Sequence, residues 1–126
     1  MFVMVESLRT NGVTEHIFRF LSTFSPVWSY GITSFLSANL INNIPMSVLY
    51  SSILAGGAGE TAVYATVVGS NLGACLTPIG ALAGIMWSSI LKTHGLKFGY
   101  ADFLKIGLTV ALPALLVALG TLALVL

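Results

Sequence analysis

The sequence predicts an all-α integral membrane protein, and its composition and its pattern of helix breaks together lead to that prediction. Of the 126 residues, 56% are hydrophobic and only 7% are charged, and the mean hydropathy is +0.97. Soluble domains usually carry about 25% charged residues. Short polar, proline-containing stretches interrupt the apolar segments. This pattern favours a re-entrant helical hairpin and one broken transmembrane helix, followed by one C-terminal transmembrane helix.

The first region, 1–24, is predicted to contain the end of a preceding helix and a polar interfacial segment. The apolar stretch 1–5 is too short to span a bilayer, which needs about 20 residues. The stretch 6–20 holds most of the charges of this half of the chain. We expect it to form a loop and a short helix that lies along the membrane interface.

The second region, 25–56, is predicted to form the re-entrant hairpin. Pro26 suits the first position of a helix, and Ser25 suits the position that caps it. That helix is expected to end near residue 40, at the sequence Asn-Asn-Ile-Pro of 42–45, and a second helix to run over about 46–54. Neither leg alone is long enough to cross the membrane. A re-entrant hairpin fits this pattern, and a single kinked spanning helix is the alternative.

The third region, 57–92, is predicted to be a discontinuous transmembrane helix. Its first leg is expected to run from Glu60 to about Val68, and its second leg over 81–91. The sequence GSNLGACLTPIG of 69–80 separates the two legs and is expected to be unwound. The residues assigned a structural role at the two breaks are Pro45, Gly69, Gly73, Pro78 and Gly80.

The last region, 93–126, is predicted to be a cytoplasmic loop followed by the C-terminal transmembrane helix. Segment 106–126 contains no charged residue and is long enough to cross a bilayer. Pro113 lies inside this helix, where a membrane helix tolerates it as a kink. Lys92, Lys97 and Lys105 place the loop on the cytoplasmic side, because loops on that side carry the excess of basic residues.

Broken helices in a membrane predict a solute-binding site. Their free backbone groups and helix ends are tolerated only when they are buried in protein or line a polar cavity, and transporters bind solutes there. Neutral side chains at such breaks suit a small polar or weakly charged solute, although asparagines at helix ends also serve as caps. The candidate substrate-binding residues are Asn39, Asn42, Asn43, Ser70, Asn71 and Thr77.

Two further residues have competing interpretations. Glu60 could couple an ion to transport, since intramembrane acids are usually functional, or could stabilise a helix N-terminus near the interface. Cys75 is a weak candidate for metal binding, because a lone buried cysteine more often packs as a small apolar residue. The sequence holds no metal-ligand cluster, basic patch or catalytic motif. We therefore expect no enzyme activity, no bound cofactor and no nucleic-acid partner.

Two segments, NNIPMSVL and GSNLGACLTPIGALAGIMW, resemble the arsenite/antimonite efflux permeases, the arsenical pump membrane proteins of the ion transporter superfamily. In that family an Asn-Asn-x-Pro tip lies on the second re-entrant hairpin, beside a broken helix. The resemblance extends from residue 2 to the C-terminus and implies the C-terminal portion of an inverted-repeat transporter. The matching positions are Asn42, Asn43, Pro45, Gly69, Asn71, Leu72, Gly73, Leu76, Thr77, Gly80, Leu82, Ala83 and Trp87.

The resemblance implies a component of a secondary transporter that works by alternating access in the plasma (inner) membrane, as part of a multi-pass protein. A proton or sodium gradient, or a separate ATPase subunit, would supply the energy. The implied partners are the lipid bilayer, a small inorganic or organic solute, the missing N-terminal scaffold half and a second copy of the protein. The alternatives are a citrate-type dicarboxylate carrier, a sodium-coupled carrier and a non-transporting remnant fragment. No arginine follows residue 22, which favours a neutral solute such as arsenous acid.

Overall fold

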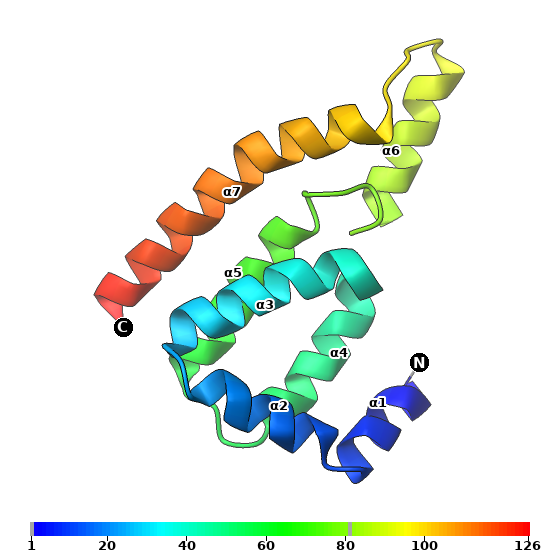
Figure 1. Cartoon of the computed structure of the whole chain (residues 1–126). Coiled ribbons are helices and arrows are strands. Elements are labelled where there is room, and N and C mark those ends of the chain that lie inside the picture. Colours follow the sequence, from blue (N-terminus) through cyan, green and yellow to red (C-terminus); the bar gives the residue numbers. More distant parts are fainter. Residues whose placement is uncertain (1, 81) are drawn as a thin grey trace.

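The computed structural model describes residues 2–80 and 82–126, apart from the side chains of four residues in two helices (Figure 1). The described residues form helices and contain no strand, which confirms the predicted all-α class. The helices are α1 (Phe2–Thr10), α2 (Val13–Ser22), α3 (Pro26–Ile41), α4 (Asn43–Leu54), α5 (Glu60–Gly73), α6 (Leu82–Thr93) and α7 (Tyr100–Val125). The undescribed side chains are those of Phe2, Met4, Val5 and Asn43.

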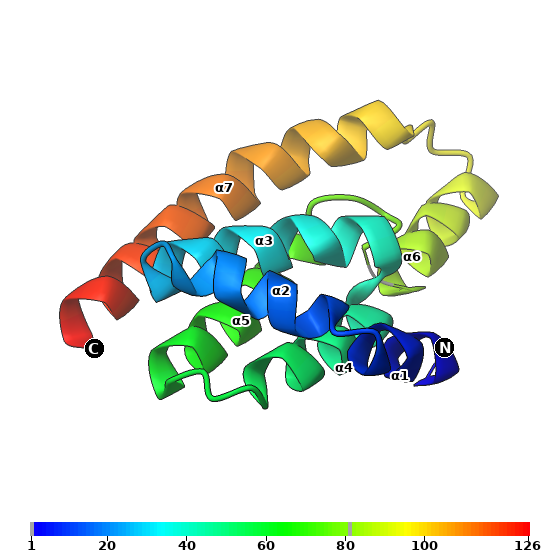
Figure 2. The ribbon, with the colours of Figure 1, turned by 60° about the horizontal axis from the view of Figure 1, so that its bottom comes forward.

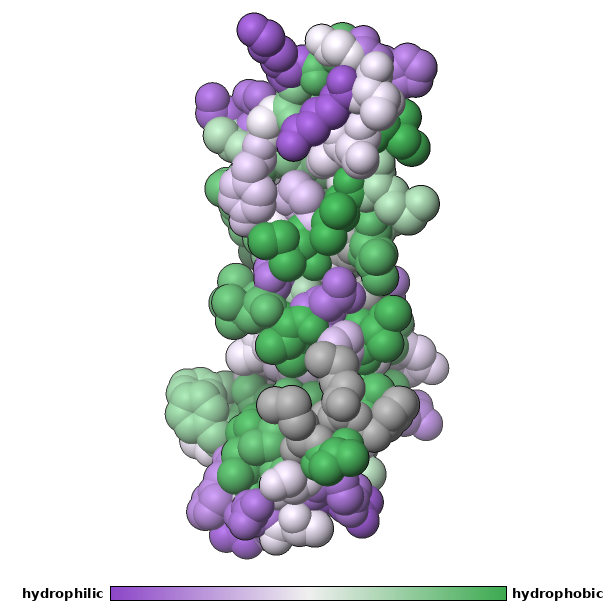
Figure 3. All heavy atoms as spheres, turned by 90° about the vertical axis from the view of Figure 1, so that its right-hand side faces the viewer, coloured by the Kyte–Doolittle hydropathy of each residue, from purple (hydrophilic) through white to green (hydrophobic). Residues whose placement is uncertain are grey.

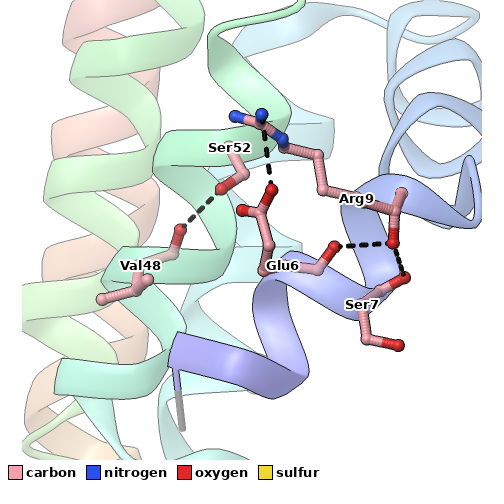
Figure 4. Close-up of polar contacts among 6 residues, drawn as sticks. Glu6, Ser7, Arg9, Val48 and Ser52 are labelled. Atoms are coloured by element: carbon pink, nitrogen blue, oxygen red, sulfur yellow. Dashed lines mark hydrogen bonds and ion pairs between the residues drawn. The ribbon is translucent and has the colours of Figure 1, made fainter.

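The N-terminal region contains two helices, α1 and α2, where the sequence predicts the end of one helix over 1–5, then a loop and a short helix. Each helix carries an exposed ion pair at helical spacing: Arg9 lies 3.5 Å from Glu6, and Arg19 lies 2.9 Å from Glu15. Such pairs each add a few tenths of a kcal/mol to a helix. Gly12, with φ +72°, turns the chain between the two helices. Figure 4 shows the Glu6 and Arg9 side chains on the face of α1 that lies beside α4.

Helices α3 and α4 form the predicted hairpin, with a shorter tip than expected. The tip is Asn42 alone, with φ +68° and ψ 154°, and α4 begins at the next residue. Pro45 therefore lies in the first turn of α4 and not before the helix. Proline is tolerated there because the backbone N–H groups of a first helical turn have no partner within the helix.

The entry to α3 follows the prediction in one respect and differs in another. Pro26 occupies the first turn of α3, but the Ser25 side chain makes no capping hydrogen bond. The Ser29 hydroxyl instead lies 2.9 Å from the Leu21 carbonyl oxygen and 3.0 Å from that of Ser25. The contact with Leu21 fixes the end of α2 against the start of α3.

Helix α5 continues to Gly73, so the predicted break over 69–80 is shorter than expected. Gly69 and Gly73 lie inside the helix, and the irregular segment covers only 74–80. The reason is close packing against α3. A β-carbon on Gly69 would collide with the Gly31 carbonyl oxygen, and one on Gly73 would collide with that of Phe35. Small residues that let two helix backbones approach closely are typical of membrane-helix interfaces.

Helix α7 is the only described helix that is long and apolar enough to cross a membrane. Figures 1 and 2 show it beside α3 and α5, whereas α6 points away from them. Ala111, Leu115 and Leu119 are its buried apolar residues on this side, and Leu119 fills the space left open by Gly31. Figure 3 shows hydrophilic residues gathered at the two ends of the molecule with a mostly hydrophobic band between them.

Truncating Leu119 is expected to loosen α7 from α3. The side chain is completely buried, so Leu119→Ala should lower the free energy of unfolding by about 2–5 kcal/mol. The matched control is Leu116→Ala, since Leu116 is 53% exposed on another face of α7. Thermal unfolding of the purified protein should show a clear loss for the first variant and little change for the second. Equal losses would contradict this packing.

Candidate functional site

The tip of the α3–α4 hairpin meets the irregular segment between α5 and α6. The Asn42 amide nitrogen donates a hydrogen bond of 3.3 Å to the Ile79 carbonyl oxygen. Asn39 lies one helical turn before Asn42 in α3. Its amide oxygen accepts a hydrogen bond of 2.8 Å from the Thr77 hydroxyl. Two breaks that are far apart in the sequence are thus joined by two hydrogen bonds.

The packing of α3 against α5 places these residues together. Asn39 and Thr77 are 38 residues apart, and the close pairs Gly31–Gly69 and Phe35–Gly73 have the same separation. A constant separation means that the two helices run parallel in one register. Helix α5 ends at Gly73, level with Phe35, so the irregular segment 74–80 runs beside the C-terminal part of α3 and brings Thr77 to Asn39. The glycines of α5 fix this register, because only glycine permits such a close approach.

Thr77 and Asn39 form a connected polar group at this junction. The Thr77 side chain is buried, and its hydroxyl also accepts the Gly80 backbone N–H at 3.2 Å. The Asn39 amide nitrogen donates to the Phe35 carbonyl oxygen at 2.9 Å. Both side chains are thus occupied by protein partners. This arrangement suits residues that hold the junction in shape.

Asn42 differs from them because its amide oxygen is buried and has no hydrogen-bond partner among the described residues. A buried acceptor without a partner costs about 1–3 kcal/mol. The backbone of Asn42 also lies in a region of φ and ψ that is close to exclusive to glycine, at a cost of about 1–3 kcal/mol. Both costs fall on one residue at the junction, where a solute with a hydrogen-bond donor could satisfy the oxygen.

The helix ends at Asn42 add no net charge. Helix α3 ends and helix α4 begins at this residue, so the partial negative charge of unpaired carbonyl groups meets the partial positive charge of unpaired N–H groups. The described part of the chain places no acidic or basic side chain in the junction contacts. The junction is therefore suited to a neutral molecule that donates hydrogen bonds through hydroxyl groups.

Four other predicted site residues lie apart from Asn42 or outside the described atoms. The Ser70 and Asn71 side chains both bond to the Val67 carbonyl oxygen of their own helix, at 3.0 and 2.8 Å. Glu60 is exposed in the first turn of α5, at the opposite end of that helix from the junction. The side chain of Asn43 lies outside the described part of the structure.

Cys75, Pro78 and Gly80 all lie in the irregular segment. Cys75 is exposed and lines an apolar cavity beside α7. Among the described residues, no group of three or more His, Cys, Asp or Glu side chains could hold a metal ion. The backbone carbonyl of Ile79 is the junction partner that the sequence did not suggest, since any residue type supplies a carbonyl.

A family model described as arsenical pump membrane protein matches residues 1–126. The chain belongs to this family. It is 32% identical to the arsenical pump membrane protein of Escherichia coli (strain K12) over 135 residues, which cover 98% of this chain and 32% of that protein. The protein of the same name from Yersinia enterocolitica is 31% identical over 136 residues, with the same coverage.

The chain thus spans about a third of the length of the curated relatives that it matches. No solved structure matches it. The family consists of membrane pumps, in agreement with the apolar composition and with the long apolar helix α7. Membership of this family confirms the resemblance that the two sequence segments carry.

Proposed function

We propose that this chain forms part of a pump that exports arsenite and antimonite, with the junction of the two breaks as its solute site. The names of its relatives support arsenical transport. The unpartnered oxygen of Asn42 carries the assignment of the site. Arsenous acid, the neutral form of arsenite, has hydroxyl groups that could donate to this oxygen. It has no charge that would call for an arginine or a lysine at the junction.

The proposed mechanism is alternating access. The hairpin tip and the segment 74–80 would bind the solute together, since hydrogen bonds already join them. They would move as one unit past a scaffold supplied by the rest of the protein, because this chain spans about a third of its relatives. An unwound segment facing helix ends near the middle of a membrane is the usual place for a transporter's solute.

The energy source and partners follow as further proposals. A proton or sodium gradient, or a separate ATPase subunit, would drive export, and Glu60 is the candidate for ion coupling within this chain. The complete protein would cross the plasma (inner) membrane several times and could act as a homodimer. Its nearest neighbours would be the lipid bilayer and the N-terminal scaffold half. On this account it binds neither a metal cofactor nor nucleic acid.

The proposal is tested by changing Thr77 in the complete protein. Thr77→Val keeps the shape of the side chain but leaves the Asn39 oxygen and the Gly80 N–H without their partner. The loss should distort the junction and lower transport about tenfold, because an unsatisfied buried group costs about 1–3 kcal/mol. Thr77→Ser keeps the hydroxyl and should transport at close to the wild-type rate.

The measurement is uptake of arsenite, antimonite and citrate into everted membrane vesicles. We expect uptake of arsenite and antimonite but not of citrate by the wild type, and a selective loss in Thr77→Val. Citrate uptake would instead favour the dicarboxylate carrier. Equal arsenite uptake by Thr77→Val and the wild type, at equal protein levels, would show that the junction takes no part in transport.

A further inference from the structure

An apolar cavity of about 400 Å³ lies between the end of α5, helix α6 and helix α7. Its walls include Leu72, Cys75, Trp87, Phe103, Ile106 and Val110. The backbone of α6 lies apart from those of the other described helices, and Figure 1 shows it diverging from α7 below their connecting loop. Ligand sites in proteins typically measure about 300–1,000 Å³, so the cavity is large enough for a flexible apolar chain.

Three aromatic rings connect α6 to α7 at the loop end of this cavity. The ring centroid of Trp87 lies 5.1 Å from that of Phe98 and 5.8 Å from that of Phe103, both in edge-to-face geometry. Phe98 and Phe103 are 6.3 Å apart. Phe98 also lines a second hollow, formed by the loop between α6 and α7. The apolar cavity and the loop hollow therefore adjoin at Phe98.

The loop hollow is basic. Lys92 and Lys97 line it and are exposed, and neither side chain takes part in an ion pair among the described residues. Asp102 also lines it, and its carboxylate accepts the Gly99 backbone N–H at 3.1 Å. The two lysines and one aspartate leave a net positive charge beside the mouth of an apolar cavity. Figure 3 shows hydrophilic residues at this end of the molecule, next to the hydrophobic band.

We propose that the cavity and the loop hollow together bind one anionic phospholipid. Its acyl chain would lie in the cavity against Trp87, and its phosphate would lie between Lys92 and Lys97. The complementary charge selects this occupant, because basic pockets between membrane helices bind anionic headgroups. A protein helix with an apolar surface could fill the cavity but would leave both lysines unpaired. A zwitterionic lipid would add a cation to a site that is already positive.

The expected preference for the anionic lipid is modest but measurable. Each basic residue near a membrane surface strengthens binding by roughly fivefold, and Asp102 offsets one of the two lysines. The site should therefore prefer phosphatidylglycerol to phosphatidylcholine by roughly fivefold. Because Trp87 lines the cavity, brominated acyl chains that enter it should quench the fluorescence of this residue.

The test places the complete protein in vesicles of phosphatidylcholine and phosphatidylglycerol, with only one of the two lipids brominated at a time. The emission of Trp87 is taken as the difference between the protein and its Trp87→Phe variant. We expect stronger quenching when phosphatidylglycerol carries the bromine. The double variant Lys92→Gln/Lys97→Gln should abolish the preference. Lys92→Arg/Lys97→Arg should keep it, which separates a loss of charge from a loss of folding.

Lys105→Gln is the matched control, because Lys105 lies in the same part of the chain but lines neither hollow. In this variant, each brominated lipid should quench the Trp87 emission as strongly as it does in the wild type. Equal quenching of Trp87 by the two brominated lipids would overturn the proposal, since the lysines would then select no headgroup. Absence of quenching by either lipid would also overturn it, since a segment of the complete protein would then fill the cavity.

Discussion

Replacing Asn42 with glycine is expected to reduce arsenite transport strongly without lowering the stability of the protein. Glycine adopts the φ of +68° and ψ of 154° freely, which removes a backbone cost of about 1–3 kcal/mol. That gain offsets the lost hydrogen bond to Ile79, which contributes about 0.5–1.5 kcal/mol. The amide oxygen that we assign to the solute is lost entirely. Transport should fall at least about tenfold, the effect of losing about 1.4 kcal/mol.

Asn42→Ala is the control for this substitution. It removes the same amide but leaves a side chain at a backbone conformation that favours glycine, so it should unfold at a lower temperature than Asn42→Gly. Both variants should show the same strong reduction in arsenite transport. The measurements are thermal unfolding of the purified complete protein and arsenite uptake into everted vesicles. Normal uptake by Asn42→Gly would show that the Asn42 side chain, which makes no capping hydrogen bond, only joins the hairpin tip to Ile79.

Adding a methyl group at Gly69 is expected to separate α3 from α5 and to disable the site at a distance. The new β-carbon would collide with the Gly31 carbonyl oxygen and the Ser34 hydroxyl. Such overpacking typically costs about 1–3 kcal/mol. Because the α3–α5 register brings Asn39 to Thr77, the hydrogen bond between them should also be lost. Gly69→Ala should therefore lower both the melting temperature and the transport rate.

Gly120→Ala provides the matched control within the same protein. Gly120 lies inside α7, and a β-carbon there would meet nothing within 4 Å. Alanine is favoured over glycine inside a helix by up to about 1 kcal/mol, so this variant should be as stable as the wild type or more stable. Equal melting temperatures of Gly69→Ala and Gly120→Ala would contradict the close packing of α3 against α5.

The sequence predicted the helix boundaries where single residues set them. Pro26 begins α3, and the hairpin turns at Asn42, the first residue of the predicted Asn-Asn-Ile-Pro tip. These boundaries depend on local backbone preferences, which a sequence carries directly. The extent of the two N-terminal helices is harder to predict. Each depends on ion pairs at helical spacing and on Gly12, and these signals are small.

The error at Gly69 and Gly73 has a different cause. Glycine disfavours an isolated helix by about 1 kcal/mol, so the sequence GSNLG on its own predicts an unwound stretch. The packing of α5 against α3 reverses that preference, because these glycines allow the two backbones to approach. The spacing of the two glycines, one helical turn apart, was the available signal for a packing face.

The candidate site could be predicted only as a set of residues. Its polar members share a position near a helix break, and the local sequence does not distinguish their roles. The division depends on the register of α3 and α5, which pairs Asn39 with Thr77 and leaves the Asn42 oxygen free. Ser70 and Asn71 instead bond within their own helix. Such pairings between distant residues are a property of the packing and not of local sequence.

The most direct test of the central claim is a double-mutant cycle between the two breaks, read as the arsenite dissociation constant of the purified complete protein. Asn42→Gly changes the hairpin tip, and Thr77→Val changes the irregular segment. If the two breaks form one solute site, each substitution should weaken binding about tenfold and the double variant should be little worse than either. Additive losses, or binding unchanged by both substitutions, would contradict a shared site at the junction.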